Sequence, residues 1–162
     1  MRVLVPIILL ALLPTLAPAC ASTRSAPDGP DRMLAAADDL DRRFVEAFSH
    51  GDLDGVMACY SRSPETVLQP PDTMIVRGWD AIRADYEAFF GSKPDVQLVL
   101  SDHRNRVEGD VVVGCGEWSL AAGEGANAPV IVRGRYLDVK GVRDGKWVYL
   151  YDCASVPMSS GE

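Results

Sequence analysis

The chain has 162 residues, of which 48% are hydrophobic and 24% are charged, a balance typical of one globular domain. Its formal net charge is −7 and its basic residues are scattered among acids, which argues against binding to the phosphate backbone of nucleic acids. The four cysteines form no CxxC pair and only two histidines accompany them, so no zinc-like spacing occurs and we expect neither a metal nor a cofactor.

The first residues have the layout of a bacterial export signal. Arg2 precedes an apolar run, Val3 to Leu13, and the small-residue site Ala17-Pro18-Ala19 follows. The run is too short to span a bilayer, so we predict that residues 1–19 are a signal peptide. Cys20 comes next, which leaves two outcomes open: a lipoprotein anchored to the membrane through Cys20, or ordinary cleavage that gives a periplasmic or secreted protein.

A linker and three helices are expected next. Residues 20–31 are small, polar and rich in Pro and Gly, which predicts a flexible linker. A helix is expected from about Arg32 to Ser49, because Leu40, Phe44 and Phe48 recur every four residues. Two more helices are expected, from Leu53 to about Tyr60 and from about Trp79 to Gly91.

The rest of the chain has the composition of strands. Two short strands are expected before the third helix, at 66–69 and 73–77, and four long ones after it, at 96–107, 110–122, 130–142 and 146–156. Asp144-Gly145 lies between β-branched and aromatic runs, which is a strong signal for a tight hairpin turn. Three helices followed by a long antiparallel meander predict an α+β domain over residues 32–157, with 158–162 as a tail.

This order of elements resembles the SnoaL-like or DUF4440 branch of the NTF2-like superfamily, which includes ketosteroid isomerases and polyketide cyclases. The resemblance rests on the segments Ala47–Asp54, Val76–Ile82 and Asp144–Trp147, the last followed by Asp152 and Ser155. It implies three N-terminal helices packed on a strongly curved antiparallel sheet, which together form a cone with an apolar interior. It also implies a homodimer that pairs through the outer face of the sheet.

Two carboxylates are the candidate catalytic groups. Asp138 and Asp152 lie on the last two predicted strands. Burial in an apolar cone would raise the pKa of either carboxyl, which is the condition for a general base near neutral pH. The alternative is that each forms a structural ion pair with an arginine such as Arg133 or Arg135.

Aromatic side chains are candidates for the lining of the pocket, or else belong to the core. Because side chains alternate along a strand, Tyr149, Tyr151 and Cys153 are expected on one face. The candidate ligand-binding residues are Tyr60, Trp79, Tyr86, Trp118, Tyr136, Tyr151 and Cys153.

Disulfide bonds are not expected, although an exported protein can form them. Cys115 and Cys153 lie on strands that a third strand separates, so their Cα atoms are about 9 to 10 Å apart. A disulfide requires about 7 Å or less. Cys59, at the end of the second helix, is also expected to be unpaired, and all three are expected to be buried thiols.

Three functions are compatible with the sequence. The first is a binding module that holds a small apolar or aromatic molecule in the cone. The second is a small cofactor-free isomerase, cyclase or dehydratase that uses a pocket carboxylate as its base. The third is a dimerisation or assembly domain, because this fold serves all three purposes. The expected partners are therefore a small hydrophobic molecule and a second copy of the chain.

Overall fold

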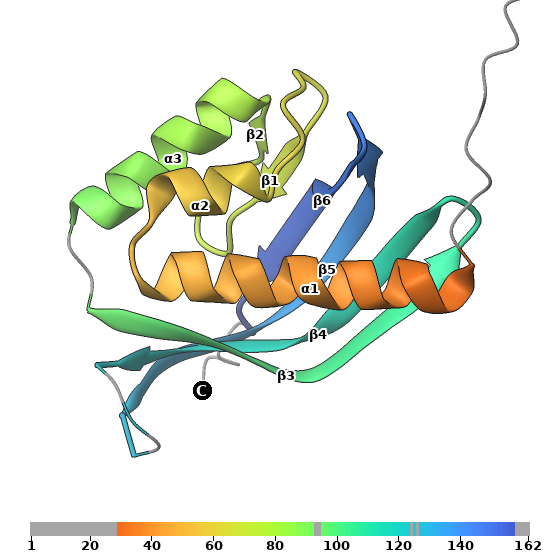
Figure 1. Ribbon diagram of the computed structural model, residues 1–162. Helices are drawn as coiled ribbons and strands as arrows, with labels where there is room; N and C mark the ends of the chain where they lie inside the picture. Colours follow the sequence, from red (N-terminus) through yellow and green to blue (C-terminus); the bar gives the residue numbers. More distant parts are fainter. Residues whose placement is uncertain (1–28, 93–94, 124, 126, 158–162) are drawn as a thin grey trace, which may run out of the picture.

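The computed structural model describes residues 29–92, 95–123, 125 and 127–157 (Figure 1). The predicted signal peptide, Cys20 and the tail lie outside the described residues, as does most of the predicted linker. The elements follow in the order α1 (Pro30–Ser49), α2 (Leu53–Ala58), β1 (Val67–Gln69), β2 (Val76–Arg77), α3 (Trp79–Gly91), β3 (Val96–Glu108), β4 (Val111–Ala122), β5 (Val130–Arg143) and β6 (Lys146–Ser155). Among the described residues, no helix has both the length and the apolar character needed to cross a membrane.

One sheet contains all six strands, in the order β2-β1-β6-β5-β4-β3. Strands β3 to β6 form the predicted antiparallel meander. The prediction of a purely antiparallel sheet is wrong at one pair of strands, because β1 pairs with β6 in parallel, with Val67 opposite Tyr151. A parallel pair needs a long crossover. Here β2, α3 and the first three strands of the meander provide it.

The hairpin between β5 and β6 has the turn that the sequence predicts. Asp144 and Gly145 both have positive φ angles, 51° and 74°. Two such residues make a type I′ turn, whose twist matches that of the flanking strands. The turn brings β6 back along β5, so that Asp138 and Asp152 become directly opposite partners.

Helix α1 is the element that lies across the meander, along β3, β4 and β6 (Figure 1). Pro30 opens the helix in its first turn, where a missing N–H costs nothing. Its residues Ala37 and Leu40 are fully buried. The expected packing of three helices on the sheet is met only in part, because α2 packs on α1 while α3 packs beside α2 and β2.

A bulge bends β3 and changes which of its side chains face α1. Between Ser101 and Arg104 the strand has one residue more than β4, and Asp102 has a φ of 44° there. Before the bulge, Leu100 lines the inner cavity. After it, His103 and Asn105 face α1, so the alternation has moved by one residue.

A second bulge reverses the alternation along β6. Val139 is opposite Tyr151 whereas Lys140 is opposite Tyr149, which leaves Leu150 as the extra residue. Tyr149 is therefore buried on the inner side while Tyr151 is about half exposed on the outer side. The expectation that Tyr149, Tyr151 and Cys153 share one face is wrong for this reason, since Asp152 takes the inner position instead.

The three cysteines in the described part of the chain are unpaired, as predicted. Leu137 lies between Cys115 and Cys153 in the sheet, and neither of these thiols nor that of Cys59 forms a disulfide. The expectation of burial is right for Cys59 but wrong for Cys115, which is exposed, and Cys153 is partly exposed. Both residues occupy the outer face of the sheet, which no helix covers among the described residues.

Candidate functional site

A fully buried lysine organises the inner face of the sheet. The Nζ atom of Lys140 lies 2.7 Å from Asp138 Oδ1, 2.9 Å from Asp41 Oδ2 and 2.8 Å from Asn105 Oδ1. An ammonium group buried without partners costs several kcal/mol, and three acceptors match its three hydrogens. The lysine therefore joins β5 to α1 through Asp41 and to β3 through Asn105.

Gly114 on β4 provides the space for this ion cluster. A Cβ atom at this position would lie 2.4 Å from Lys140 Nζ, 2.5 Å from Asp138 Oδ1 and 2.7 Å from Asn105 Oδ1. Its backbone N–H also donates a hydrogen bond of 3.1 Å to Asp138 Oδ1. A glycine inside a strand often marks such a close approach.

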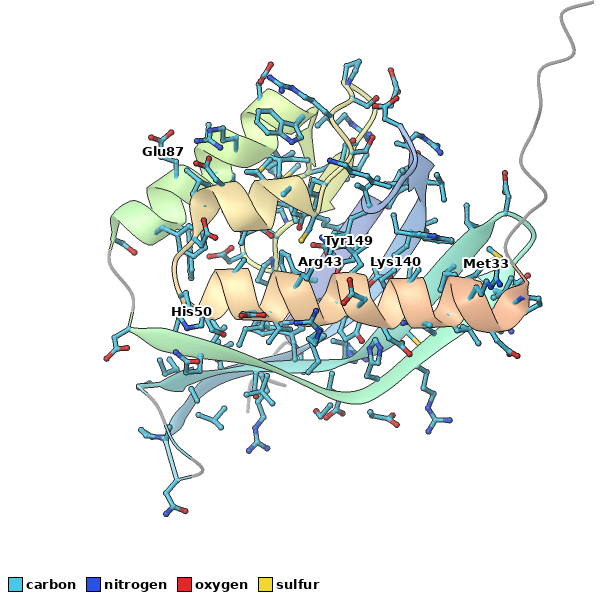
Figure 2. All side chains as sticks on the ribbon, viewed as in Figure 1. Met33, Arg43, His50, Glu87, Lys140 and Tyr149 are labelled. Carbon is cyan, nitrogen blue, oxygen red and sulfur yellow. The ribbon has the colours of Figure 1, made fainter. Side chains whose placement is uncertain are left out.

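Asp41, on the buried side of α1, accepts hydrogen bonds from two more groups. The hydroxyl of Tyr149 donates to its Oδ1 at 2.5 Å, and Nδ2 of Asn105 donates to its Oδ2 at 3.0 Å. Nδ2 of Asn105 also donates to Asp38 at 2.8 Å. Figure 2 shows Lys140 and Tyr149 beside α1, the helix that carries Asp41.

His103 extends the network toward solvent. Its Nδ1 lies 2.5 Å from the hydroxyl of Tyr136, and its Nε2 lies 3.4 Å from carboxylate oxygens of Asp38 and Asp41. The two acids and the histidine are close enough to suggest a metal site. However, Nδ2 of Asn105 lies 2.8 to 3.2 Å from an atom of each, so the amide already fills that position.

Beside the ion cluster is a cavity of about 170 Å³ between α1, α3 and the sheet. Its polar lining consists of Asp41, Asp85, Tyr86, Tyr136, Asp138, Tyr149 and Asp152. Its apolar lining consists of Phe44, Phe48, Leu68, Pro70, Pro71, Phe89, Leu98, Leu100, Trp118, Leu120 and Ala154. The cavity is therefore apolar and aromatic, with its carboxylates contributed by α1, α3, β5 and β6.

Both candidate catalytic carboxylates line the cavity. Burial raises the pKa of Asp138 to about 7, although the adjacent Lys140 ammonium acts in the opposite direction. Burial also raises the pKa of Asp152, against a hydrogen bond from the hydroxyl of Tyr60 that lowers it. Neither acid pairs with an arginine, so the alternative of ion pairs with Arg133 or Arg135 is wrong.

The predicted ligand-binding residues fall into two groups. Tyr86, Trp118 and Tyr136 line the cavity. The other four, placed elsewhere, are Tyr60, Trp79, Tyr151 and Cys153. Tyr60 is buried in the core with its hydroxyl on Asp152, Trp79 stacks against the guanidinium groups of Arg62 and Arg83, and the β6 bulge turns Tyr151 and Cys153 outward.

The polar residues of the site that were not predicted from the sequence include Asp41, His103, Asn105 and Lys140. For two of them a signal was present. Asp41 lies in the apolar stripe of α1, four residues after Ala37 and three before Phe44. Lys140 is two residues after Asp138 and four after Tyr136, so it lies on the same face of the strand as these two candidate site residues. His103 and Asn105 gave no such signal, because their orientation depends on the β3 bulge.

The sequence profile of the SnoaL-like domain matches residues 42–150, which is more than half of the chain. The chain belongs to the SnoaL-like domain family. A comparison with curated proteins found no match.

Solved structures agree that this SnoaL-like domain has the NTF2-like α+β fold. A candidate dehydratase of the NTF2-like family from Streptomyces avermitilis is 15% identical, with a TM-score of 0.70 over 80% of this chain and 100% of that chain. An NTF2-like superfamily protein from Salmonella enterica is 20% identical, with a TM-score of 0.65 over 81% and 95%. A protein from Xanthomonas campestris described as a candidate calcium/calmodulin-dependent protein kinase II association domain is 25% identical, with a TM-score of 0.62 over 83% and 91%.

The first prediction concerns Gly114 in the SnoaL-like domain. We expect Gly114→Ala to lower the free energy of unfolding by about 1 to 3 kcal/mol, because the added methyl group displaces the buried ion cluster. Gly91→Ala is the control: it lies at the end of α3 with open space around it and should cost nothing. Equal unfolding midpoints for the two variants in urea would contradict this packing.

The second prediction is a pH dependence caused by Asp138. Its folded pKa, about 7, is above its ordinary value of 3.8, so the folded protein keeps a proton that the unfolded chain releases. This group therefore makes the free energy of unfolding fall as pH rises from about 4 to about 7, by at most about 1.4 kcal/mol per pH unit. Asp138→Asn removes the effect, so urea unfolding at several pH values should show a flatter fall for the variant. Parallel curves for the two proteins would rule out the raised pKa.

Proposed function

We propose that this SnoaL-like protein binds a small apolar or aromatic molecule in its inner cavity. The cavity is the observation that supports the proposal: it holds about 170 Å³ and is lined by Phe, Tyr, Trp and Leu side chains. An apolar cavity of about 150 Å³ takes up a molecule the size of benzene. We therefore expect ligands with a single ring, and no room for a steroid without a rearrangement of the walls.

The binding prediction uses two neighbouring residues of β6. Ala154 lines the cavity, whereas Ser155 is exposed. Ala154→Phe should fill the cavity and abolish binding of single-ring compounds, while Ser155→Phe should leave it unchanged. A ligand at a hundred times its Kd should raise the free energy of unfolding by about 2.7 kcal/mol, which thermal-shift measurements detect.

Two results would oppose the binding proposal. One is that no single-ring compound stabilises the native protein. The other is that ligands stabilise the Ala154→Phe variant as strongly as the native protein. Chemical-shift changes confined to the outer face of the sheet would place the ligand elsewhere.

A second candidate function is proton transfer on the bound molecule, as in an isomerase, cyclase or dehydratase. The observation that favours it is the pair of carboxylates at facing positions on β5 and β6. Burial raises the pKa of both, so one acid can hold a proton while the other accepts one. Asp152 is the better candidate base, because Asp138 already binds the Lys140 ammonium.

The catalytic prediction is tested by the exchange of hydrogen for deuterium next to the carbonyl of single-ring ketones. We expect the protein to accelerate this exchange in ²H₂O, and Asp152→Asn to slow it by about 10² to 10⁴-fold, as for the loss of a general base. Asp110→Asn, in the exposed turn between β3 and β4, is a control that removes the same charge. If exchange is equally slow with both variants and the native protein, the proton-transfer proposal fails while binding stands.

We also propose, from the sequence pattern alone, that the protein is exported. In both cases the chain is cut between Ala19 and Cys20, and Cys20 is then either lipidated or left unmodified.

A homodimer through the outer face of the sheet is supported by exposed apolar side chains there, which include Val99, Leu137 and Tyr151. Assignment to the DUF4440 branch and a role in assembly alone remain further proposals of this kind.

A further inference from the structure

The tyrosine hydroxyl hydrogens around the cavity are directed at protein atoms. Tyr149 donates to Asp41, and Tyr60 donates to Asp152. The hydroxyl of Tyr86 lies 2.8 Å from that of Tyr60. Because the hydrogen of Tyr60 is already committed to the carboxylate, Tyr86 is the donor in this pair. These hydroxyls therefore offer lone pairs, and not hydrogens, to a bound molecule.

The hydroxyl of Tyr136 is oriented in the same way. Oδ1 of Asn105 accepts from Lys140, so Nδ2 faces the acids and gives its two hydrogens to Asp38 and Asp41. Nε2 of His103 then receives no hydrogen from the amide and carries its own, toward the same acids. In the tautomer that carries its hydrogen on Nε2, Nδ1 is an acceptor, and Tyr136 donates to it.

The side-chain donors of Lys140 and Trp118, beside the cavity, also have acceptors in the protein. Lys140 has three acceptors around its ammonium group. Nε1 of Trp118 donates to the carbonyl oxygen of Arg135. Within the described residues that line the cavity, the tyrosine O–H groups and the Trp118 N–H group therefore each have an acceptor in the protein.

Two carboxylate oxygens are left over. Asp138 uses Oδ1 for Lys140 and for the backbone of Gly114, and Asp152 uses Oδ2 for Tyr60. Asp138 is only 2% exposed and lines the cavity together with Asp152. Oδ2 of Asp138 and Oδ1 of Asp152 can therefore accept hydrogen bonds from a molecule in the cavity. The cluster thus places one lysine among three carboxyl groups, those of Asp41, Asp138 and Asp152, and offers them no second cation.

We propose that the ligand of this cavity is an organic cation, a single-ring primary ammonium compound whose N–H groups bind Asp138 Oδ2 and Asp152 Oδ1. The inference rests on the proposed binding function and names its ligand class. An ammonium group supplies both the donors and the positive charge that the cavity lacks. The rings of Phe44, Tyr86 and Trp118 add the aromatic faces that favour cations.

The test compares benzylamine, which is charged at pH 7, with benzyl alcohol, which has the same size and no charge. Titrations of the native protein are followed by calorimetry. We expect benzylamine to bind at least ten-fold more tightly than benzyl alcohol. Asp138→Asn and Asp152→Asn should each reduce this ratio toward one, whereas Asp110→Asn should leave it unchanged. Because the ratio is measured within one variant, a general loss of stability does not alter it.

The outcomes separate the two proposals. If benzyl alcohol binds as tightly as benzylamine, or if neither asparagine variant changes the ratio, the cation inference is wrong while the binding function stands. If neither compound binds and no single-ring compound does, the proposed function fails and the inference fails with it. A ratio that depends on Asp138 or Asp152 supports both.

Discussion

The burial of Lys140 between Asp41 and Asp138 is the interaction on which the arrangement of the inner face depends. It connects α1 to β5, and through Asn105 it also connects both to β3. Buried ion pairs often add little net stability, since desolvation offsets their attraction, but removing one partner leaves an unpaired charge. A helix shifted along the sheet would separate Asp41 from the lysine. The cluster therefore fixes where α1 lies, and with it the wall of the cavity.

The same cluster gathers carboxyl groups beside the cavity. Asp152 stands opposite Asp138, so a third carboxylate approaches a site with one lysine. Burial and the shortage of positive charge both favour the protonated acid, which is why the pKa of Asp138 reaches about 7. Two buried tyrosines, Tyr60 and Tyr149, hydrogen-bond to carboxylates here and limit the cost. Buried charged groups often add less stability than apolar packing, and carboxyl groups with raised pKa values in a cavity are typical of functional sites.

The sequence predicted the elements well because their signals are local. Helix periodicity, glycine stops and the Asp144-Gly145 turn depend on neighbours within a few residues, and the predicted bounds differ from the observed ones by only a few residues. The faces of the strands were predicted less well. Alternation holds only until a bulge, and the extra residue at Leu150 inverts every later position of β6. The partner of Lys140 on α1 is about a hundred residues away in the chain, and no local pattern indicates such a contact.

The bulges in β3 and β6 make a prediction from strand alternation fail, and they also position the polar residues of the site. One directs His103 and Asn105 at α1, and the other places Asp152 in the cavity beside Asp138. A sheet that bends only to close a core would put apolar side chains at the inward positions after each bulge. Here both bulges are followed by polar inward side chains, Asn105 bound to Asp41 and Asp152 bound to Tyr60, and both aspartates line the cavity. Departures from local rules that converge on one place are typical of functional sites, which favours a ligand-binding or catalytic role over a purely structural one.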